Sequence, residues 1–181
     1  MRKGLIAGTA LALALAGSSG DIALAQQATT MQLAQAGKIS AEDQEFLTEA
    51  IQAGVAEVQL SELALEKSQD EQVRQFAERM VQDHTAANQQ LVGLAEAAGN
   101  TPPTEMDQKH HALHQQLSQL SGEEFDRQYM QGQVQEHEAA VELFASEANQ
   151  PTGPVDQLAG ELLPTLRQHL QMAQEISDSI V

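Results

Sequence analysis

Residues 73–98 read VRQFAERMVQDHTAANQQLVGLAEAA, and this stretch decides the fold. Its apolar residues recur at intervals of three and four, the spacing that places side chains on one face of an α-helix. One polar residue, His84, occupies this face near the middle of the segment. The stretch therefore predicts an amphipathic helix that carries a histidine into a hydrophobic core. The residues on this face are Val73, Ala77, Met80, His84, Ala87, Leu91, Leu94 and Ala98.

Three other segments have the same helical period, and each again places one polar residue on its apolar face. A shorter periodic segment, residues 105–120, lies between the second and third long ones. No segment alternates polar and apolar residues as a half-buried strand does. The sequence thus predicts four long helices and one short helix. The long segments are residues 40–67 with Glu57, 69–98 with His84, 122–149 with His137, and 155–180 with His169.

Capping and turn residues separate these helices. Sequences of the capping-box type, with Ser first and an acidic residue three positions later, begin at Ser40, Ser68 and Ser121. Gly99 suits the left-handed position after a helix, and Pro154 suits the first position of the last helix. Short turns join helices one to two and three to four, whereas the connection from two to three is longer. The predicted fold is an all-α, ferritin-like antiparallel four-helix bundle with a short extra helix in that crossover.

The N-terminal residues have the organisation of an export signal. Arg2 and Lys3 form a positive region, an uncharged apolar run follows, and Ala23-Leu24-Ala25 fits a small-x-small cleavage site. A transmembrane anchor is the alternative, but the apolar run is too short to span ~30 Å of hydrocarbon comfortably. We expect a periplasmic or secreted protein without an integral membrane segment after cleavage. The expected parts are a signal peptide at residues 1–25, a disordered tether at 26–39 and the bundle domain at 40–181.

The composition excludes several classes of function. The chain carries 9 basic and 26 acidic residues, and its formal net charge of −17 repels nucleic acid and attracts cations. It has no cysteine, which excludes thiolate metal sites, iron–sulfur clusters and cysteine nucleophiles. We find no serine–histidine–acid arrangement, phosphate-binding glycine loop or basic patch. An enzymatic role is therefore not the expectation, and the sequence points to no protein partner.

The polar residues of the four long helices lie at a similar depth. The expected helix midpoints fall near residues 54, 84, 135 and 167, within about three residues, or ~5 Å, of the polar positions. In an antiparallel bundle the midpoints share one level, so one carboxylate and three imidazoles should form a single layer. These groups are sufficient ligands for a single Zn, Fe, Mn or Cu ion. The predicted ligands are Glu57, His84, His137 and His169.

A metal-free polar layer is the competing interpretation. In that case Glu57 would bond to a histidine, with Tyr129 supporting the layer from one or two helical turns away. The layer would then only fix the register of the helices. Asp83, Glu136 and Glu138 flank the histidines in sequence. They are expected to be solvated or to support the layer from outside, rather than to be ligands.

One further pair of histidines lies in the short helix. His110 and His114 are four residues apart, so they would lie on the same helix face and could form a surface metal pair. The simpler interpretation is a polar helix face near a loop.

Several short motifs follow one another in a characteristic order. They are Glu57, Asp83-His84-Thr85, Phe125-Asp126-x-x-Tyr129, His137 and Leu163-Pro164-x-x-x-x-His169-Leu170. This combination resembles the exported bacterial proteins catalogued as domain of unknown function 4142, often labelled "predicted outer membrane protein". The resemblance covers about residues 42–177. It implies a ferritin-like fold and export, and it implies no particular reaction.

The broader ferritin-like superfamily suggests di-iron chemistry, but this sequence departs from it. A di-iron site needs a Glu-x-x-His pair on each of two helices. Three residues before the core histidines stand Val81, Val134 and Leu166. A di-iron oxidase or ferroxidase centre is therefore not expected. Two hypotheses remain: an exported bundle that binds one metal ion, and a non-enzymatic envelope protein with a structural or stress-related interaction role.

Overall fold

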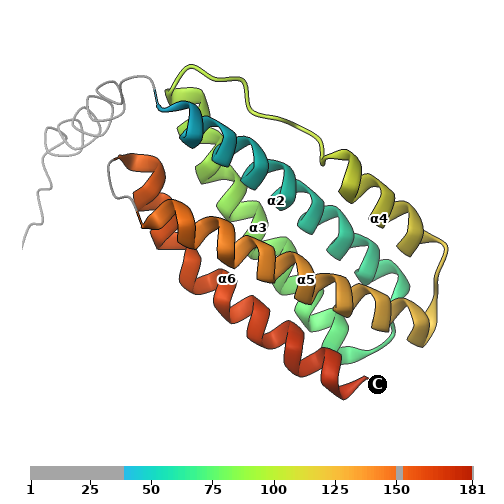
Figure 1. Cartoon of the computed structure of the whole chain (residues 1–181). Helices are drawn as coiled ribbons and strands as arrows, with labels where there is room; N and C mark the ends of the chain where they lie inside the picture. Colours follow the sequence, from blue (N-terminus) through green and yellow to red (C-terminus); the bar gives the residue numbers. More distant parts are fainter. Residues whose placement is uncertain (1–38, 150–152, 181) are drawn as a thin grey trace, which may run out of the picture. The chain divides into compact units, whose positions relative to one another are not determined.

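The computed structural model describes residues 39–149 and 153–180, and every regular element in these residues is an α-helix (Figure 1). The predicted signal peptide, and residues 26–38 of the predicted tether, lie outside the described residues. No helix among the described residues is long and apolar enough to cross a membrane. The helices are α2 (Ala41–Lys67), α3 (Glu71–Ala97), α4 (Gln108–Ser118), α5 (Gly122–Ala148) and α6 (Pro154–Ser179).

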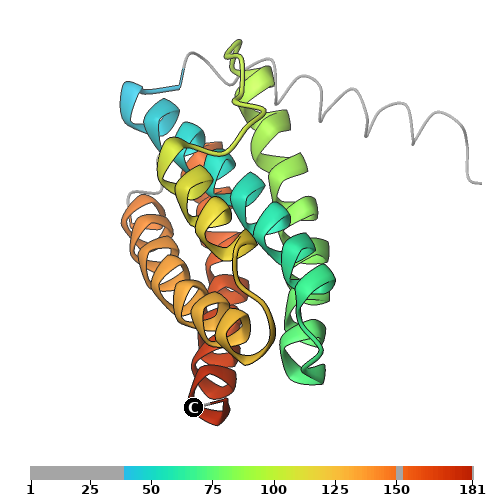
Figure 2. The ribbon, with the colours of Figure 1, turned by 90° about the vertical axis from the view of Figure 1, so that its right-hand side faces the viewer.

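The four long helices form the predicted antiparallel bundle. Helix α2 packs along α3, and α5 packs along α6, so that the bundle consists of two helical hairpins. The hairpins meet where α2 faces α5 and where α3 faces α6. Between α3 and α5 the chain returns along the length of the bundle, and α4 in this crossover lies against α2 and α5 (Figure 2).

Helix caps explain where the long helices begin. Ser40 and Asp43 form the predicted capping box at the start of α2. The capping box predicted at Ser68 is wrong, because Ser68 ends α2 and Asp70 caps α3 by accepting two backbone N–H bonds of its first turn. The capping box predicted at Ser121 is also wrong, because Ser121 precedes α5 but makes no side-chain cap. An Asp carboxylate so close to the helix start satisfies the free amides and also interacts favourably with the helix dipole.

The crossover is ordered by caps and by one lysine. Gly99 follows α3 with a φ of 81°, the left-handed conformation predicted for it. Helix α4 is shorter than expected, because Asp107 caps it and the buried Met106 precedes that cap. At the other end of α4, Lys67 Nζ donates to two backbone carbonyls at 2.5 and 3.2 Å. These contacts hold the crossover against the α2–α5 side of the bundle.

The core consists of two hydrophobic clusters, one in each half of the bundle. One contains Phe76 and Tyr129, and the other contains Phe46 and Phe144, whose rings lie 5.0 Å apart edge to face. On α3, α5 and α6 the predicted histidine lies between the stretches that build the two clusters, and on α2 Glu57 lies at the edge of one stretch, next to Ala56. The middle of the bundle is therefore the place where polar groups gather.

Candidate metal centre

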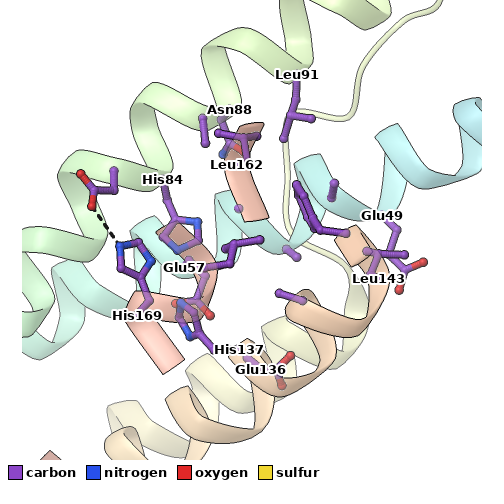
Figure 3. A pocket seen from close by; sticks show the side chains of 18 of the residues that line it. Glu49, Glu57, His84, Asn88, Leu91, Glu136, His137, Leu143, Leu162 and His169 are labelled. Carbon is purple, nitrogen blue, oxygen red and sulfur yellow. Dashed lines mark hydrogen bonds and ion pairs between the residues drawn. The ribbon is translucent and has the colours of Figure 1, made fainter. Parts of the chain in front are cut away.

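Three of the four predicted ligands come together in the middle of the bundle. His84 of α3, His137 of α5 and His169 of α6 each offer a ring nitrogen, and these three nitrogens lie within 4.8 Å of one another. The rings form a nearly equilateral triangle. Their centroids are 5.6 Å apart for His84–His137, 5.4 Å for His84–His169 and 5.4 Å for His137–His169. Figure 3 shows the three side chains converging from three different helices.

The size of this triangle fits a single metal ion. With Zn–N bonds of 2.0–2.1 Å and N–Zn–N angles of roughly 110–120°, imidazole centroids lie roughly 5.2–5.5 Å apart. The observed separations of 5.4 to 5.6 Å are close to that range. An ion at the centre would draw the nitrogens to roughly 3.4 Å from one another, which small side-chain rotations can achieve.

One nitrogen on each ring has no hydrogen-bond partner among the described residues. These atoms are Nε2 of His84, Nε2 of His137 and Nδ1 of His169. The three residues are 8%, 1% and 1% exposed, respectively. Buried polar atoms nearly always have a partner, so three unpaired nitrogens in one place call for a bound ion or water.

The second nitrogen of two rings is held by a partner on the protein. His169 Nε2 donates to the carboxylate of Asp83 at 2.9 Å. His137 Nδ1 donates to the backbone carbonyl of Gln133 at 2.9 Å. Each bond fixes the tautomer and leaves a lone pair on the unpaired nitrogen, as is usual for metal-ligating histidines. Asp83 thus supports the layer from outside, as the sequence suggested.

The charge states suit metal binding. Burial lowers the pKa of His84 well below its usual range, and the neighbouring imidazoles of His137 and His169 lower it further. Burial also lowers the pKa of His169 to about 4, even though its hydrogen bond to Asp83 acts in the opposite direction. Both rings are therefore neutral at pH 7, which is the ligating form. Burial alone would raise the pKa of Asp83, but hydrogen bonds from Arg79 and His169 outweigh it and lower that pKa.

The fourth predicted ligand, Glu57 of α2, lies beside the histidines but outside the group of atoms within 4.8 Å. It is buried, and its Oε2 accepts a hydrogen bond of 2.8 Å from Gln133 Nε2. Burial raises the pKa of Glu57, while His137 and the bond from Gln133 oppose this rise. Gln133 therefore bridges Glu57 and His137. Sequence reasoning missed it, although a position four residues before His137 lies on the same helix face.

Tyr129 lies one layer away from the histidines. Its hydroxyl shares a hydrogen bond of 2.9 Å with Ser61 Oγ, and both side chains are buried. Burial, together with the charge of Glu57, raises the pKa of Tyr129, so it stays a neutral phenol. Phe76 lies between Tyr129 and His137, and its ring centroid is 6.3 Å from the ring centroid of each. Any support that Tyr129 gives to the histidine layer would therefore act through the packing of Phe76.

Comparison with known proteins places the chain in a family. The family profile described as Domain of unknown function (DUF4142) matches residues 28–176. The chain belongs to the DUF4142 family. No curated protein matches this DUF4142 chain.

Two solved structures share the fold of the DUF4142 chain. A DUF305 fragment from Deinococcus radiodurans has a TM-score of 0.69 and 20% identity, covering 77% of this chain and 97% of that one. A DUF305 protein from Streptomyces coelicolor, described as thought to be secreted, has a TM-score of 0.67 and 15% identity, covering 77% and 92%. At such identities the similarity concerns the fold alone.

A pocket of about 340 Å³ opens beside the three histidines of the DUF4142 chain. All four long helices line it, and on α3 it reaches from His84 to Leu91 (Figure 3). Gly54 of α2 makes room for Asn88 of α3, because a Cβ at Gly54 would lie 2.1 Å from Asn88 Oδ1. That oxygen is buried and has no hydrogen-bond partner among the described residues. The pocket thus has the three ring nitrogens and one unpaired amide oxygen at its wall.

Helix α4 contributes His110 to the same pocket, and His110 is not the exposed residue that the sequence suggested. It is 5% exposed, its Nε2 lies 3.2 Å from Glu136 Oε2, and its Nδ1 lies 2.9 Å from Asp107 Oδ2. Lys109 Nζ also donates to Glu136, at 2.7 Å. Burial alone would raise the pKa of Glu136, but hydrogen bonds from His110 and Lys109 outweigh it and lower that pKa to about 2. His110 is engaged by carboxylates and not by His114.

A second group of potential ligands lies near the ends of three helices. Carboxylate oxygens of Asp43, Glu147 and Asp156 lie within 4.8 Å of one another. Two of these residues cap helices, because Asp43 accepts from the backbone N–H of Ser40 and Asp156 accepts from that of Gly153. Burial, and then the charges of Asp43 and Asp156, raise the pKa of Glu147 to about 7. This cluster has a structural explanation in helix capping.

Proposed function

We propose that this DUF4142 protein binds one transition-metal ion through His84, His137 and His169. The observation that carries the proposal is the set of three buried ring nitrogens without a hydrogen-bond partner among the described residues. Each nitrogen comes from a different helix, and the triangle of rings has the size that one ion needs. Support for two of the rings from Asp83 and the Gln133 carbonyl agrees with such a role.

The donor set favours certain ions. Imidazole nitrogens suit Zn, Cu and Fe, whereas Mn prefers sites richer in oxygen. Affinities for one set of nitrogen ligands rise from Mn to Cu, with Zn below Cu. We therefore expect Cu(II) and Zn(II) to bind more tightly than Fe(II) or Mn(II). Glu57 is proposed to compensate the charge of the ion from close by, or to complete its coordination after a side-chain rotation.

A metal-free layer that only fixes helix register is the alternative. It would need the histidines to bond with one another or with Glu57. Among the described residues no hydrogen bond joins two of the histidines, and Glu57 is bonded to Gln133. The unpaired nitrogens therefore favour a metal-binding layer over a metal-free layer in a non-enzymatic protein.

Only one ion is proposed. A di-iron centre would need further carboxylates projecting into the layer from the helices that carry the histidines. Val81, Val134 and Leu166 occupy the positions where those carboxylates would stand. Oxygen activation at a two-iron centre is accordingly not part of the proposal.

Metal analysis of the protein purified without chelator tests the proposal. We expect one equivalent of metal per chain after exposure to Zn(II) or Cu(II). Elemental mass spectrometry and titration calorimetry measure this stoichiometry. His84→Gln and His137→Gln should each reduce uptake well below one equivalent. His111→Gln is the matched control, since it removes an exposed histidine outside the pocket and should leave uptake unchanged.

Two outcomes would reject the metal site. One is a folded protein that takes up none of Zn, Cu, Fe or Mn. The other is equal uptake by the wild type and by both core-histidine variants, which would place the ion elsewhere. Either result would return the layer to a structural role.

We further propose that the chain is exported and acts in the periplasm or outside the cell. The charged start, the apolar run and the Ala23-Leu24-Ala25 site support this, and one structural neighbour is described as thought to be secreted. Expression of the full chain in a bacterial host should yield a processed protein that begins at Gln26. A cytoplasmic product that retains Met1 would contradict the proposal.

A further inference from the structure

The pocket beside the histidines exists because its wall is built from small side chains. Leucine at any of several of these positions would fill space, and filled cores are usually more stable than hollow ones. At about 30 Å³ per water in the liquid, the pocket of about 340 Å³ has room for a small organic molecule. The small wall residues are Ala50, Ala53, Ala86, Ala87, Ala139 and Ala140.

The histidines determine what the head of such a molecule should be. A divalent ion bound by three neutral imidazoles keeps its charge in a buried site, and buried charge needs a counter-charge. Glu57 can supply at most one negative charge from close by, and it is bonded to Gln133 and lies outside the ligand group, so a divalent ion would still need one more. All three histidines line the pocket, so an anionic group in the pocket could reach an ion held between them.

The carboxylates around the pocket do not prevent entry of an anion, because most are paired. Asp83 is bonded to Arg79, and Glu136 is bonded to Lys109. Asp107 lies 2.9 Å from a ring nitrogen of His110. Their negative charges are therefore largely compensated within the rim itself.

The part of the pocket wall away from the histidines determines the length and polarity of the tail that a ligand can have. From His84 to Leu91 the pocket follows eight residues of α3, which are seven steps or ~10 Å along the helix. Along α3 the apolar lining residues are Ala86, Ala87 and Leu91, beside the polar Asn88 and Gln90, and α2 and α6 add the polar Glu49 and Thr165. An extended alkyl chain advances roughly 1.3 Å per carbon, which is less than the advance per residue of a peptide strand. A length of ~10 Å therefore corresponds to about eight carbons.

The geometry points to a small monoanion with an unbranched apolar tail as the ligand of this pocket, with its head on the metal and its tail along the alanine wall. This inference rests on the proposed metal site. A medium-chain carboxylate has the required chemistry: the carboxylate completes the coordination of the ion, and each methylene removed from water adds to the affinity.

Calorimetry on the Zn-loaded protein, with octanoate and acetate as the probes, tests this inference. Octanoate should bind at one site per chain and at least roughly 100-fold more tightly than acetate, because each buried methylene contributes several-fold. With Co(II) in place of Zn(II), octanoate should change the visible absorption bands of the ion, which reports coordination of the head group.

Variants separate the pocket from the metal. Ala87→Leu and Ala140→Leu place bulk at two different positions of the wall, and either should weaken octanoate binding about tenfold or more while metal uptake stays at one equivalent. Ala97→Leu is the control, because this exposed residue of α3 lies outside the pocket. Two filling variants are used so that the failure of one to fold does not end the test.

The outcomes distinguish the two proposals. Equal affinity for octanoate and acetate, or octanoate binding that survives both filling variants, overturns the ligand while leaving the metal site in place. If octanoate binds the metal-free protein with the same affinity, its carboxylate does not need the ion. That result also overturns the proposed ligand. Absence of metal uptake overturns both proposals.

Discussion

At the scale of single residues, Asp83 determines how His169 is presented. The carboxylate accepts one bond from His169 Nε2 and another from Arg79, so it is itself fixed on both sides. Its lowered pKa keeps it ionised at neutral pH, and an ionised acceptor makes a stronger bond than a neutral one. This contact holds the His169 ring in place and leaves Nδ1 as its unpaired nitrogen.

Asp83→Asn should therefore weaken metal binding by about 10- to 100-fold. The neutral amide accepts a weaker hydrogen bond from His169, and it can also turn its NH₂ group toward the ring. Competition with a chromophoric chelator measures the affinity. Glu138→Gln is the control, since it removes an exposed charge next to His137 with the same change in net charge. An equal loss in both variants would indicate a long-range charge effect in place of orientation.

The metal-free protein should lose stability as the pH falls from 7 to 5. The pKa of His169 is lowered from 6.5 to about 4 on folding, so the unfolded chain binds more protons in this window. Its contribution is complete above pH 6.5 and decreases by about 2 kcal/mol by pH 5. His84 acts in the same direction, whereas His110, whose pKa is raised chiefly by its bond to Glu136, acts in the opposite one.

Urea unfolding at pH 7, 6 and 5 measures this effect. Because other groups also titrate, the informative quantity is the difference between the wild type and His169→Gln. The variant should lose less free energy of unfolding over this range. The same pH dependence in both proteins would show that His169 is not the source.

Residue-level features differ in how far the sequence reveals them. The shared depth of His84, His137 and His169 is readable from periodicity, because the helix rise converts sequence position into height. The offset of Glu57 and the bridging role of Gln133 are not readable in this way. They depend on which side-chain rotamers the packed helices allow, and that information is spread over all four helices.

At the scale of elements, the helix ends carry most of the local sequence information. The capping box at Ser40 and the glycine at Gly99 act as their residue types predict. The start of α3 was predicted less well, because Ser68 and Asp70 are both good capping residues and only tertiary structure selects between them. Helix α4 begins at Gln108, after its N-cap Asp107, and not at the predicted residue 105.

The carboxylates at one group of helix ends repel one another. Asp43 and Asp156 stand at the N-termini of α2 and α6, where the helix dipole favours negative charge. Glu147 stands in the last turn of α5, where the dipole disfavours it. Its pKa of about 7 reflects burial first and these two neighbouring charges second.

Glu147→Gln should therefore stabilise the protein at pH 8 by about 1 kcal/mol, after allowance for solvent screening. At pH 6 the gain should be smaller, because the wild-type carboxyl is then largely protonated in the folded state. Thermal or urea unfolding at the two pH values checks this. Glu142→Gln, at an exposed position of the same helix, provides the control. A destabilised Glu147→Gln protein would show that the charge is needed.

At the scale of the whole molecule, the histidines join the two hairpins. His84 belongs to the α2–α3 hairpin, whereas His137 and His169 belong to the α5–α6 hairpin. The overall bundle was predictable because four long amphipathic helices with short and long connections allow few arrangements. The pocket was not predictable, since a space between helices depends on how closely they approach.

Metal binding should raise the melting temperature. An ion that binds only the folded state, present at 100 times its dissociation constant, adds about 2.7 kcal/mol. For a domain of this size that corresponds to about 5–10 °C. Differential scanning fluorimetry with and without Zn(II) measures the shift. His137→Gln should show no shift and His111→Gln a full one. A shift retained in His137→Gln would mean that the ion acts at another site.

The division of the ligands between two hairpins has a kinetic consequence. Each hairpin consists of neighbouring segments of sequence and can form early, whereas docking of the two hairpins must also close the long crossover. The three histidines come together only after docking, so an ion bound to them would stabilise the native state more than the transition state that precedes it. Zn(II) should then slow unfolding in stopped-flow experiments while the folding rate stays nearly constant. The ion would then determine the lifetime of the folded molecule and not the rate at which it folds.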